Sequence, residues 1–156
     1  MNPSMQVGAL PWRIGKDGRA RILLVTARDK PRWIIPKGHR SKKRRDQDAA
    51  AREAREEAGV KGIIADPIGQ YLHRRPRRAA VTVTVYELKV TSEIRKWRER
   101  DQRRRKWVTP RKAVKMIADE GLRALLASFV PSREADTLRQ GSAKSPPTAP
   151  ATRDLR

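Results

Sequence analysis

The chain has 156 residues, with 38 lysine and arginine against 17 aspartate and glutamate residues, a formal net charge of +21. So strong a positive field attracts polyanions, but its sign does not choose among nucleic acid, polyphosphate and phosphorylated small molecules. The absence of cysteine excludes disulfides, thiol chemistry and cysteine-based zinc sites. No apolar run approaches the roughly 20 residues of a membrane span, and the N-terminus lacks a secretory signal pattern, so we expect a cytoplasmic protein without membrane partners.

The length suits one domain, which we place at residues 6–131. Residues 1–5 are expected to form a disordered leader. Beyond Pro131 the apolar content falls away into serine, alanine, proline and threonine, so residues 132–156 are expected to form a disordered tail.

Extended stretches bounded by turn residues predict strands at residues 6–14, 21–27, 63–73 and 79–90, with short extended segments at 33–36 and 106–108. In one of them Val81, Val83 and Val85 alternate with polar residues, as a sheet strand should. Residues 37–45 are expected to form a loop, and the basic stretch 74–78 a turn between two strands.

Three segments have features of helices. Asp46 is expected to cap a helix that runs to about residue 58, and Thr109 a second helix with Pro110 at its first position. A third helix is predicted by apolar residues at helical spacing, namely Leu122, Leu125, Leu126 and Phe129. Helices interleaved with a mixed sheet predict the α/β class, as an α/β/α sandwich.

The first of these helices carries an acidic cluster. Glu53, Glu56 and Glu57 stand at i, i+3 and i+4, so their side chains are expected to share one face. Clustered carboxylates repel one another, and a divalent cation relieves that repulsion; all-oxygen ligation suits Mg²⁺ or Mn²⁺. The alternative is a solvated face with ordinary ion pairs, such as Arg52 with Glu56.

The wider pattern is more specific than the helix alone. Residues 38–60 follow G-x5-E-x7-R-E-U-x-E-E-x-G-U, where U is apolar, with every spacing kept and Arg44 in place of the first glutamate. This stretch resembles the Nudix box, the loop-helix-loop of Nudix hydrolases. Residues 8–13, 22–26, 32–38 and 105–107 look like the bacterial branch similar to diphosphoinositol polyphosphate phosphohydrolases.

The resemblance implies a Nudix-type fold and roles for the box residues. Glu53 and Glu57 would hold metal, Glu56 would hold metal or act as the base, and Arg52 would orient a box glutamate; we take Glu56, Arg52 and Glu53 as catalytic. Loss of the acid at Arg44 would affect metal affinity more than activity. Further ligand candidates are Glu99, Asp101 and Glu87. The residues expected to bind substrate are Arg28, Lys37, Gly38, Lys42, Lys43, Arg75 and Arg103.

These features favour a Mg²⁺- or Mn²⁺-dependent hydrolase that cleaves a pyrophosphate linkage in a polyphosphorylated small molecule. Dinucleoside polyphosphates and diphosphoinositol polyphosphate-like molecules are the expected substrates. One alternative is an RNA 5′-end pyrophosphohydrolase. Another is a catalytically weak module that binds nucleic acid or a different polyanion through the basic surface. The sequence leaves the oligomeric state open.

Overall fold

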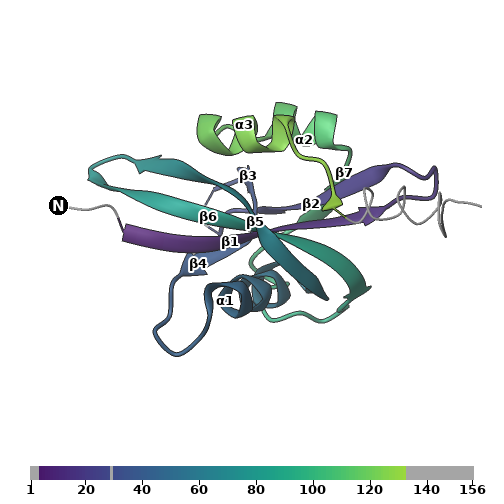
Figure 1. Ribbon diagram of the computed structural model, residues 1–156, viewed down its shortest axis with the longest axis horizontal. Helices are drawn as coiled ribbons and strands as arrows, with labels where there is room; N and C mark the ends of the chain where they lie inside the picture. Colours follow the sequence, from purple (N-terminus) through teal and green to yellow (C-terminus); the bar gives the residue numbers. More distant parts are fainter. Residues whose placement is uncertain (1–3, 29, 133–156) are drawn as a thin grey trace, which may run out of the picture.

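The computed structural model describes residues 4–28 and 30–132, which form a central sheet with helices on both sides (Figure 1). The strands are β1 (Ser4–Ile14), β2 (Ala20–Thr26), β3 (Trp33–Ile34), β4 (Lys37–His39), β5 (Val60–Arg75), β6 (Arg78–Glu93) and β7 (Arg105–Val108). The helices are α1 (Asp46–Glu53), the short π-helix η1 (Ala54–Ala58), α2 (Pro110–Met116) and α3 (Glu120–Ala127).

The strands form one mixed sheet. Its main order is β3-β2-β1-β6-β5, while β4 pairs with β1 and β7 pairs with β2. β1 runs parallel to β6, and the other pairings are antiparallel. The parallel pair at the centre needs a long crossover connection, and the segment that carries the acidic cluster lies within it.

The two faces of the sheet bury separate cores, because successive strand residues point to opposite sides. Val7 and Val25 face the side covered by four small residues of the first helical segment, Ala49, Ala50, Ala54 and Ala58. Leu10 and Leu24 face the other side, where they share a core with Leu122 of α3 and other residues of the α2–α3 segment. This confirms the predicted α/β/α sandwich with a mixed sheet (Figure 1).

The first helical segment differs from the prediction of one regular helix over residues 46–58. α1 ends at Glu53 and continues as η1, a wider turn in which the Gly59 N–H donates to the Ala54 carbonyl, five residues back. Asp46 is not the cap: Arg45 occupies that position without a side-chain hydrogen bond. Asp46 lies in the first turn and pairs with Arg40 at 3.0 Å. π-turns within helices often occur at functional sites, and this one carries Glu56 and Glu57.

Three further boundaries differ. Residues 37–39 form β4 and pair with β1, so the expected loop begins only at Arg40. The β5–β6 hairpin is longer than predicted, because Arg75 pairs with Arg78 across the turn and continues the ladder. Ser4 and Met5 belong to β1, so the expected leader is wrong for them. Residues 1–3 of the leader and 133–156 of the tail lie outside the described residues.

The caps of α2 and α3 explain where these helices begin. Thr109 caps α2 as predicted, and its hydroxyl accepts from the Lys112 N–H at 3.1 Å. α3 begins at Glu120, where Asp119 accepts from the N–H groups of Gly121 and Leu122 at 3.0 and 3.2 Å. Among the described residues, no helix has the length and apolar content needed to cross a membrane.

Candidate active site

Glu57 is the buried acid at the centre of the site. It is 6% exposed, and its Oε1 accepts from the Lys37 N–H at 3.2 Å. The pKa of Glu57 is raised to about 8, mainly by burial; the charge of Arg103 and the Lys37 N–H lower it, and contact with Glu53 adds to the increase. Glu57 therefore holds a proton at neutral pH unless more positive charge reaches it.

Glu53 reaches the same place through the absence of a side chain at Gly38. A Cβ atom at Gly38 would lie 2.3 Å from Glu53 Oε2, far inside van der Waals contact. The glycine thus lets the Glu53 carboxyl lie against the backbone of β4, next to the strand residue that hydrogen-bonds Glu57. Gly38, predicted to bind substrate, acts here by making room for Glu53.

Glu56 is held by arginines rather than by the other two acids. Arg52 Nε donates to Glu56 Oε2 at 2.7 Å, the pairing that the sequence suggested, and Arg98 approaches the same oxygen at 3.5 Å. The described residues contain no ready-made group of three acidic or histidine side chains placed to hold a metal. Of the three glutamates expected to share one face, only Glu53 and Glu57 are in contact, while the arginines neutralise Glu56.

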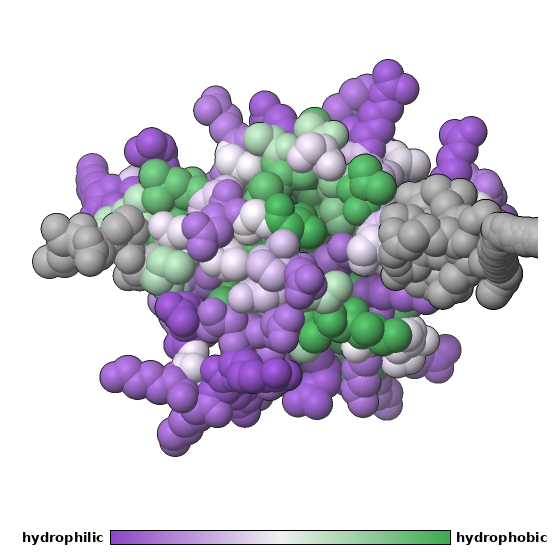
Figure 2. Space-filling model, viewed as in Figure 1, coloured by the Kyte–Doolittle hydropathy of each residue, from purple (hydrophilic) through white to green (hydrophobic). Residues whose placement is uncertain are grey.

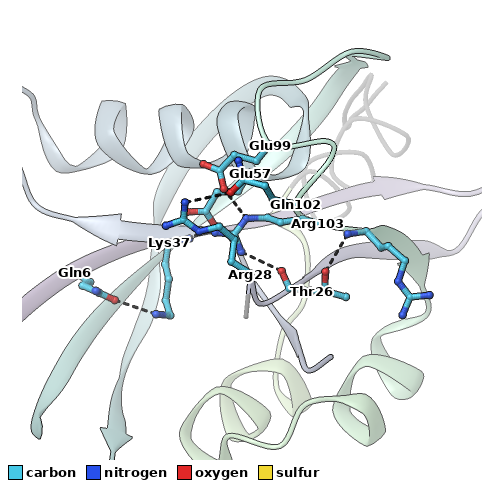
Figure 3. Close-up of polar contacts among 9 residues, drawn as sticks. Gln6, Thr26, Arg28, Lys37, Glu57, Glu99, Gln102 and Arg103 are labelled. Carbon is cyan, nitrogen blue, oxygen red and sulfur yellow. Dashed lines mark hydrogen bonds and ion pairs between the residues drawn. The ribbon is translucent and has the colours of Figure 1, made fainter. Parts of the chain in front are cut away.

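Arg103, predicted to bind substrate, is an internal counter-ion of the acids (Figure 3). Its side chain is 8% exposed, its Nε lies 2.7 Å from Glu99 Oε1, and another of its nitrogens lies 3.7 Å from Glu57 Oε1. It also donates to the Thr26 carbonyl at 3.0 Å. The Glu99 N–H donates to the Glu56 carbonyl at 3.1 Å, so the loop between β6 and β7 is hydrogen-bonded to η1.

Of the three further ligand candidates, the structure places Glu99 at the site and the other two elsewhere. Asp101 is solvent-exposed and lies 3.8 Å from Arg100. Glu87 is buried, and its carboxylate accepts from the N–H and hydroxyl of Ser132 at 2.8 and 2.9 Å. Glu87 follows Tyr86, which packs on the α1 side, so strand alternation turns it to the opposite face of the sheet.

The predicted phosphate-binding side chains lie in three different places. Lys37 is mostly buried beside Glu57; its Nζ donates to Gln6 Oε1 at 3.1 Å, and burial lowers its pKa. Arg28 donates to Gln102 in a neighbouring hollow. Arg75 donates twice to the Ala79 carbonyl across the hairpin turn.

Lys42 and Lys43 lie apart from Lys37, Arg28 and Arg75. Both side chains are exposed in the loop before α1. Lys42 lines a hollow beside Pro67 and Tyr86, not the cavity that Lys37 lines. The structure therefore does not bring these two lysines to Glu57.

A cavity of about 180 Å³ opens beside Lys37. Its walls come from the segment before the box, from β5 and from the start of α3, and its polar or aromatic lining residues are Arg32, Trp33, Lys37, Tyr71, His73, Arg74 and Asp119. His73 Nδ1 lies 3.0 Å from Asp119 Oδ2. The Arg104 guanidinium lies 5.6 Å from the Trp33 ring centroid.

Apart from Lys37, these cavity residues were not predicted from the sequence to belong to the site. Residues 117–119 meet the segment before the box through tertiary contacts, among them an isolated bridge between Trp33 and Ile117, which no local pattern predicts. The one available signal was Asp119, a helix-capping residue type placed just before an apolar helical pattern.

The chain resembles known proteins over most of its length. It matches the NUDIX domain over residues 5–129. It is 30% identical over 128 residues to "Nudix hydrolase 21, chloroplastic" of Arabidopsis thaliana, a match covering 80% of this chain and 65% of that protein. It is 33% identical over 99 residues to diphosphoinositol polyphosphate phosphohydrolase 3-beta of Bos taurus, covering 62% and 59%. The C. elegans Ap4A hydrolase structure has a TM-score of 0.60 at 20% identity, over 81% of this chain and 95% of that chain.

This chain therefore belongs to the NUDIX domain family. The match confirms the predicted family, and the relatives named as hydrolases support the predicted enzyme class. The likeness to the nematode structure supports the predicted fold. The chain spans less than two thirds of the length of either relative. Assignment to a bacterial branch of the family stays a prediction.

Proposed function

We propose that this chain is a divalent-metal-dependent hydrolase that cleaves a phosphoanhydride bond in a polyphosphorylated substrate. The observation that carries the proposal is the buried Glu57 carboxyl, in contact with Glu53 and hydrogen-bonded to the Lys37 N–H. Two adjacent acids, one of them buried, cost stability unless positive charge compensates them. A cation-binding role accounts for both acids, whereas a solvated acidic face would leave Glu57 exposed.

The donor chemistry fits Mg²⁺ or Mn²⁺, because both prefer carboxylate oxygens. Glu53 and Glu57 would hold the ion, and binding would require Glu57 to lose its proton. When bound, such an ion would neutralise phosphate oxygens and lower the pKa of a bound water. Glu56 would join as a further ligand or serve as the base.

The arginine contacts favour Glu56 as the base that receives the proton of the attacking water. Both arginine contacts of Glu56 fall on Oε2, which leaves Oε1 as the oxygen that would accept the proton. Arg52 would act as a positioning residue by fixing the carboxylate at 2.7 Å.

The cavity beside Lys37 favours a substrate with several phosphates. Three of its lining residues, Arg32, Lys37 and Arg74, carry positive charge, and charge-assisted contacts to phosphate oxygens are stronger than neutral hydrogen bonds. Lys37 lines this cavity and donates its N–H to Glu57, so a substrate held there would lie next to the acids. The names of two similar proteins, a diphosphoinositol polyphosphate phosphohydrolase and an Ap4A hydrolase, support this substrate class.

The test is a metal-dependent turnover screen with three substrates: diadenosine tetraphosphate, a diphosphoinositol polyphosphate and a 5′-triphosphorylated RNA. Wild-type protein is expected to hydrolyse at least one of the first two with Mg²⁺ or Mn²⁺, and Glu57→Gln is expected to lose that activity. Glu120→Gln is the matched control, because Glu120 is an exposed acid on α3 that does not line the cavity beside Lys37.

Retained turnover in Glu57→Gln would refute the role of the acids. Preference for the triphosphorylated RNA would favour the RNA 5′-end alternative. Inactivity on all three substrates, with tight and salt-sensitive nucleic-acid binding, would favour the catalytically weak module.

A further inference from the structure

Two open hollows lie between the first helical segment and strands β5 and β6, and Arg44 lines both. One, of about 510 Å³, extends past Pro67 and Tyr86. The other, of about 410 Å³, extends past Arg55 and Lys61. Because they share Arg44, the two hollows adjoin, and we call them together the groove. Figure 2 shows hydrophilic residues crowded on the lower side of the molecule, where Figure 1 places α1.

The charge of this groove is strongly positive. Seven basic and two acidic residues line the two hollows. Both acids are already neutralised, Asp46 by Arg40 at 3.0 Å and Asp48 by Arg45 at 3.3 Å.

Four of the basic residues are exposed and make no ion pair with any acid in the described part of the chain: Lys42, Arg44, Arg55 and Lys61. We call these four the α1 strip.

Arg44 places its charge where the two hollows adjoin. It stands where the Nudix box pattern has a glutamate, and an acid there would place a negative charge at the junction of the two hollows. The arginine instead changes the local charge by two units in the positive direction and joins two basic surfaces into one.

We propose that the α1 strip binds the phosphate backbone of a nucleic acid. The groove follows α1 and η1, whose thirteen residues span about 20 Å at the rise of an α-helix. That length suits several consecutive phosphates, whereas a small phosphorylated ligand would occupy one hollow. Tyr86, the aromatic residue of the groove, is 8% exposed and offers little ring surface for stacking on bases. The contacts are therefore with phosphates and independent of sequence.

The test compares two variants that lose the same charge from opposite faces of the sheet. Arg44→Gln/Arg55→Gln/Lys61→Gln neutralises three members of the strip. Arg111→Gln/Lys112→Gln/Lys115→Gln neutralises three exposed basic residues of α2, which covers the other face. All six side chains are exposed, and circular dichroism melting curves check that both variants fold.

Binding is measured by fluorescence anisotropy in EDTA, with a labelled single-stranded RNA that has a 5′-hydroxyl end. This RNA contains no phosphoanhydride, so the result does not depend on the proposed hydrolysis. The strip variant is expected to bind the RNA at least about tenfold more weakly than wild type. The slope of log affinity against log salt concentration is expected to become shallower by about 2, because each of the three lost phosphate contacts contributes about 0.7. The α2 variant is expected to stay within twofold of wild type.

Equal losses in both variants would overturn the proposal, because they would show attraction to net charge alone. Absence of RNA binding by the wild type would overturn it too. Competition with inorganic polyphosphate gives a third outcome. If polyphosphate displaces the RNA with more than tenfold higher affinity at equal phosphate concentration, the ligand is polyphosphate and the proposal is overturned.

Discussion

The protonation of Glu57 predicts an unusual pH dependence of stability in the metal-free protein. Its pKa is about 8 in the folded state and about 4.3 for an unperturbed glutamate. Between these values the folded protein holds one more proton than the unfolded chain, so the free energy of unfolding falls as pH rises. The slope from this group approaches about 1.4 kcal/mol per pH unit.

Glu57→Gln removes the titrating group and keeps the shape of the side chain. The free energy of unfolding, measured by urea denaturation in EDTA at pH 5.5, 6.5 and 7.5, is expected to fall with pH more steeply in wild type than in the variant. The difference between the two proteins is expected to change by about 1 kcal/mol per pH unit. Parallel pH profiles would refute the conclusion that Glu57 is buried in its protonated form. Glu120→Gln, at an exposed position, is expected to follow wild type.

Three more substitutions test other parts of the site. Gly38→Ala places a Cβ 2.3 Å from Glu53 Oε2, so we expect displacement of Glu53 and about a hundredfold loss of kcat/KM; an unchanged kcat/KM would contradict this. Arg103→Met leaves Glu99 without its buried counter-ion, so we expect a loss of about 3 kcal/mol in urea denaturation, partly restored by Mn²⁺; a loss below about 1 kcal/mol would show that the pair contributes little. Asp119→Ala removes the α3 cap at a cost of about 1 kcal/mol, whereas Asp119→Asn, which can still cap, is expected to lose less; equal losses would place the role of Asp119 in its charge.

The sequence predicted the architecture well because its signals are local. The apolar run of β2, the alternation in β6 and the four alanines that face β1 set the layers without knowledge of distant contacts. The boundaries were less accurate where pairing partners decide them. β4 forms because Lys37 and Gly38 pair with Gly8 and Val7 of β1, and the composition of residues 37–39 does not indicate a strand.

The candidate site was predicted in part. Spacing alone placed Glu53 and Glu57 together and Arg52 on Glu56. It did not predict that η1 widens the helix, which leaves Glu57 buried while Glu56 pairs with Arg52 and Arg98. Nor could spacing show that Arg103, some 46 residues after Glu57, neutralises the acids instead of facing solvent. Contacts between segments so far apart in sequence depend on the completed sheet.

Mn²⁺ binding, measured by electron paramagnetic resonance at pH 6, 7 and 8, tests the central claim most directly. Because one proton must leave Glu57 before the ion binds, wild-type affinity is expected to rise with pH, approaching tenfold per unit below the pKa. Glu57→Gln is expected to bind weakly and without this dependence. Equal affinities in the two proteins, with the same response to pH, would contradict the assignment of Glu57 as a metal ligand.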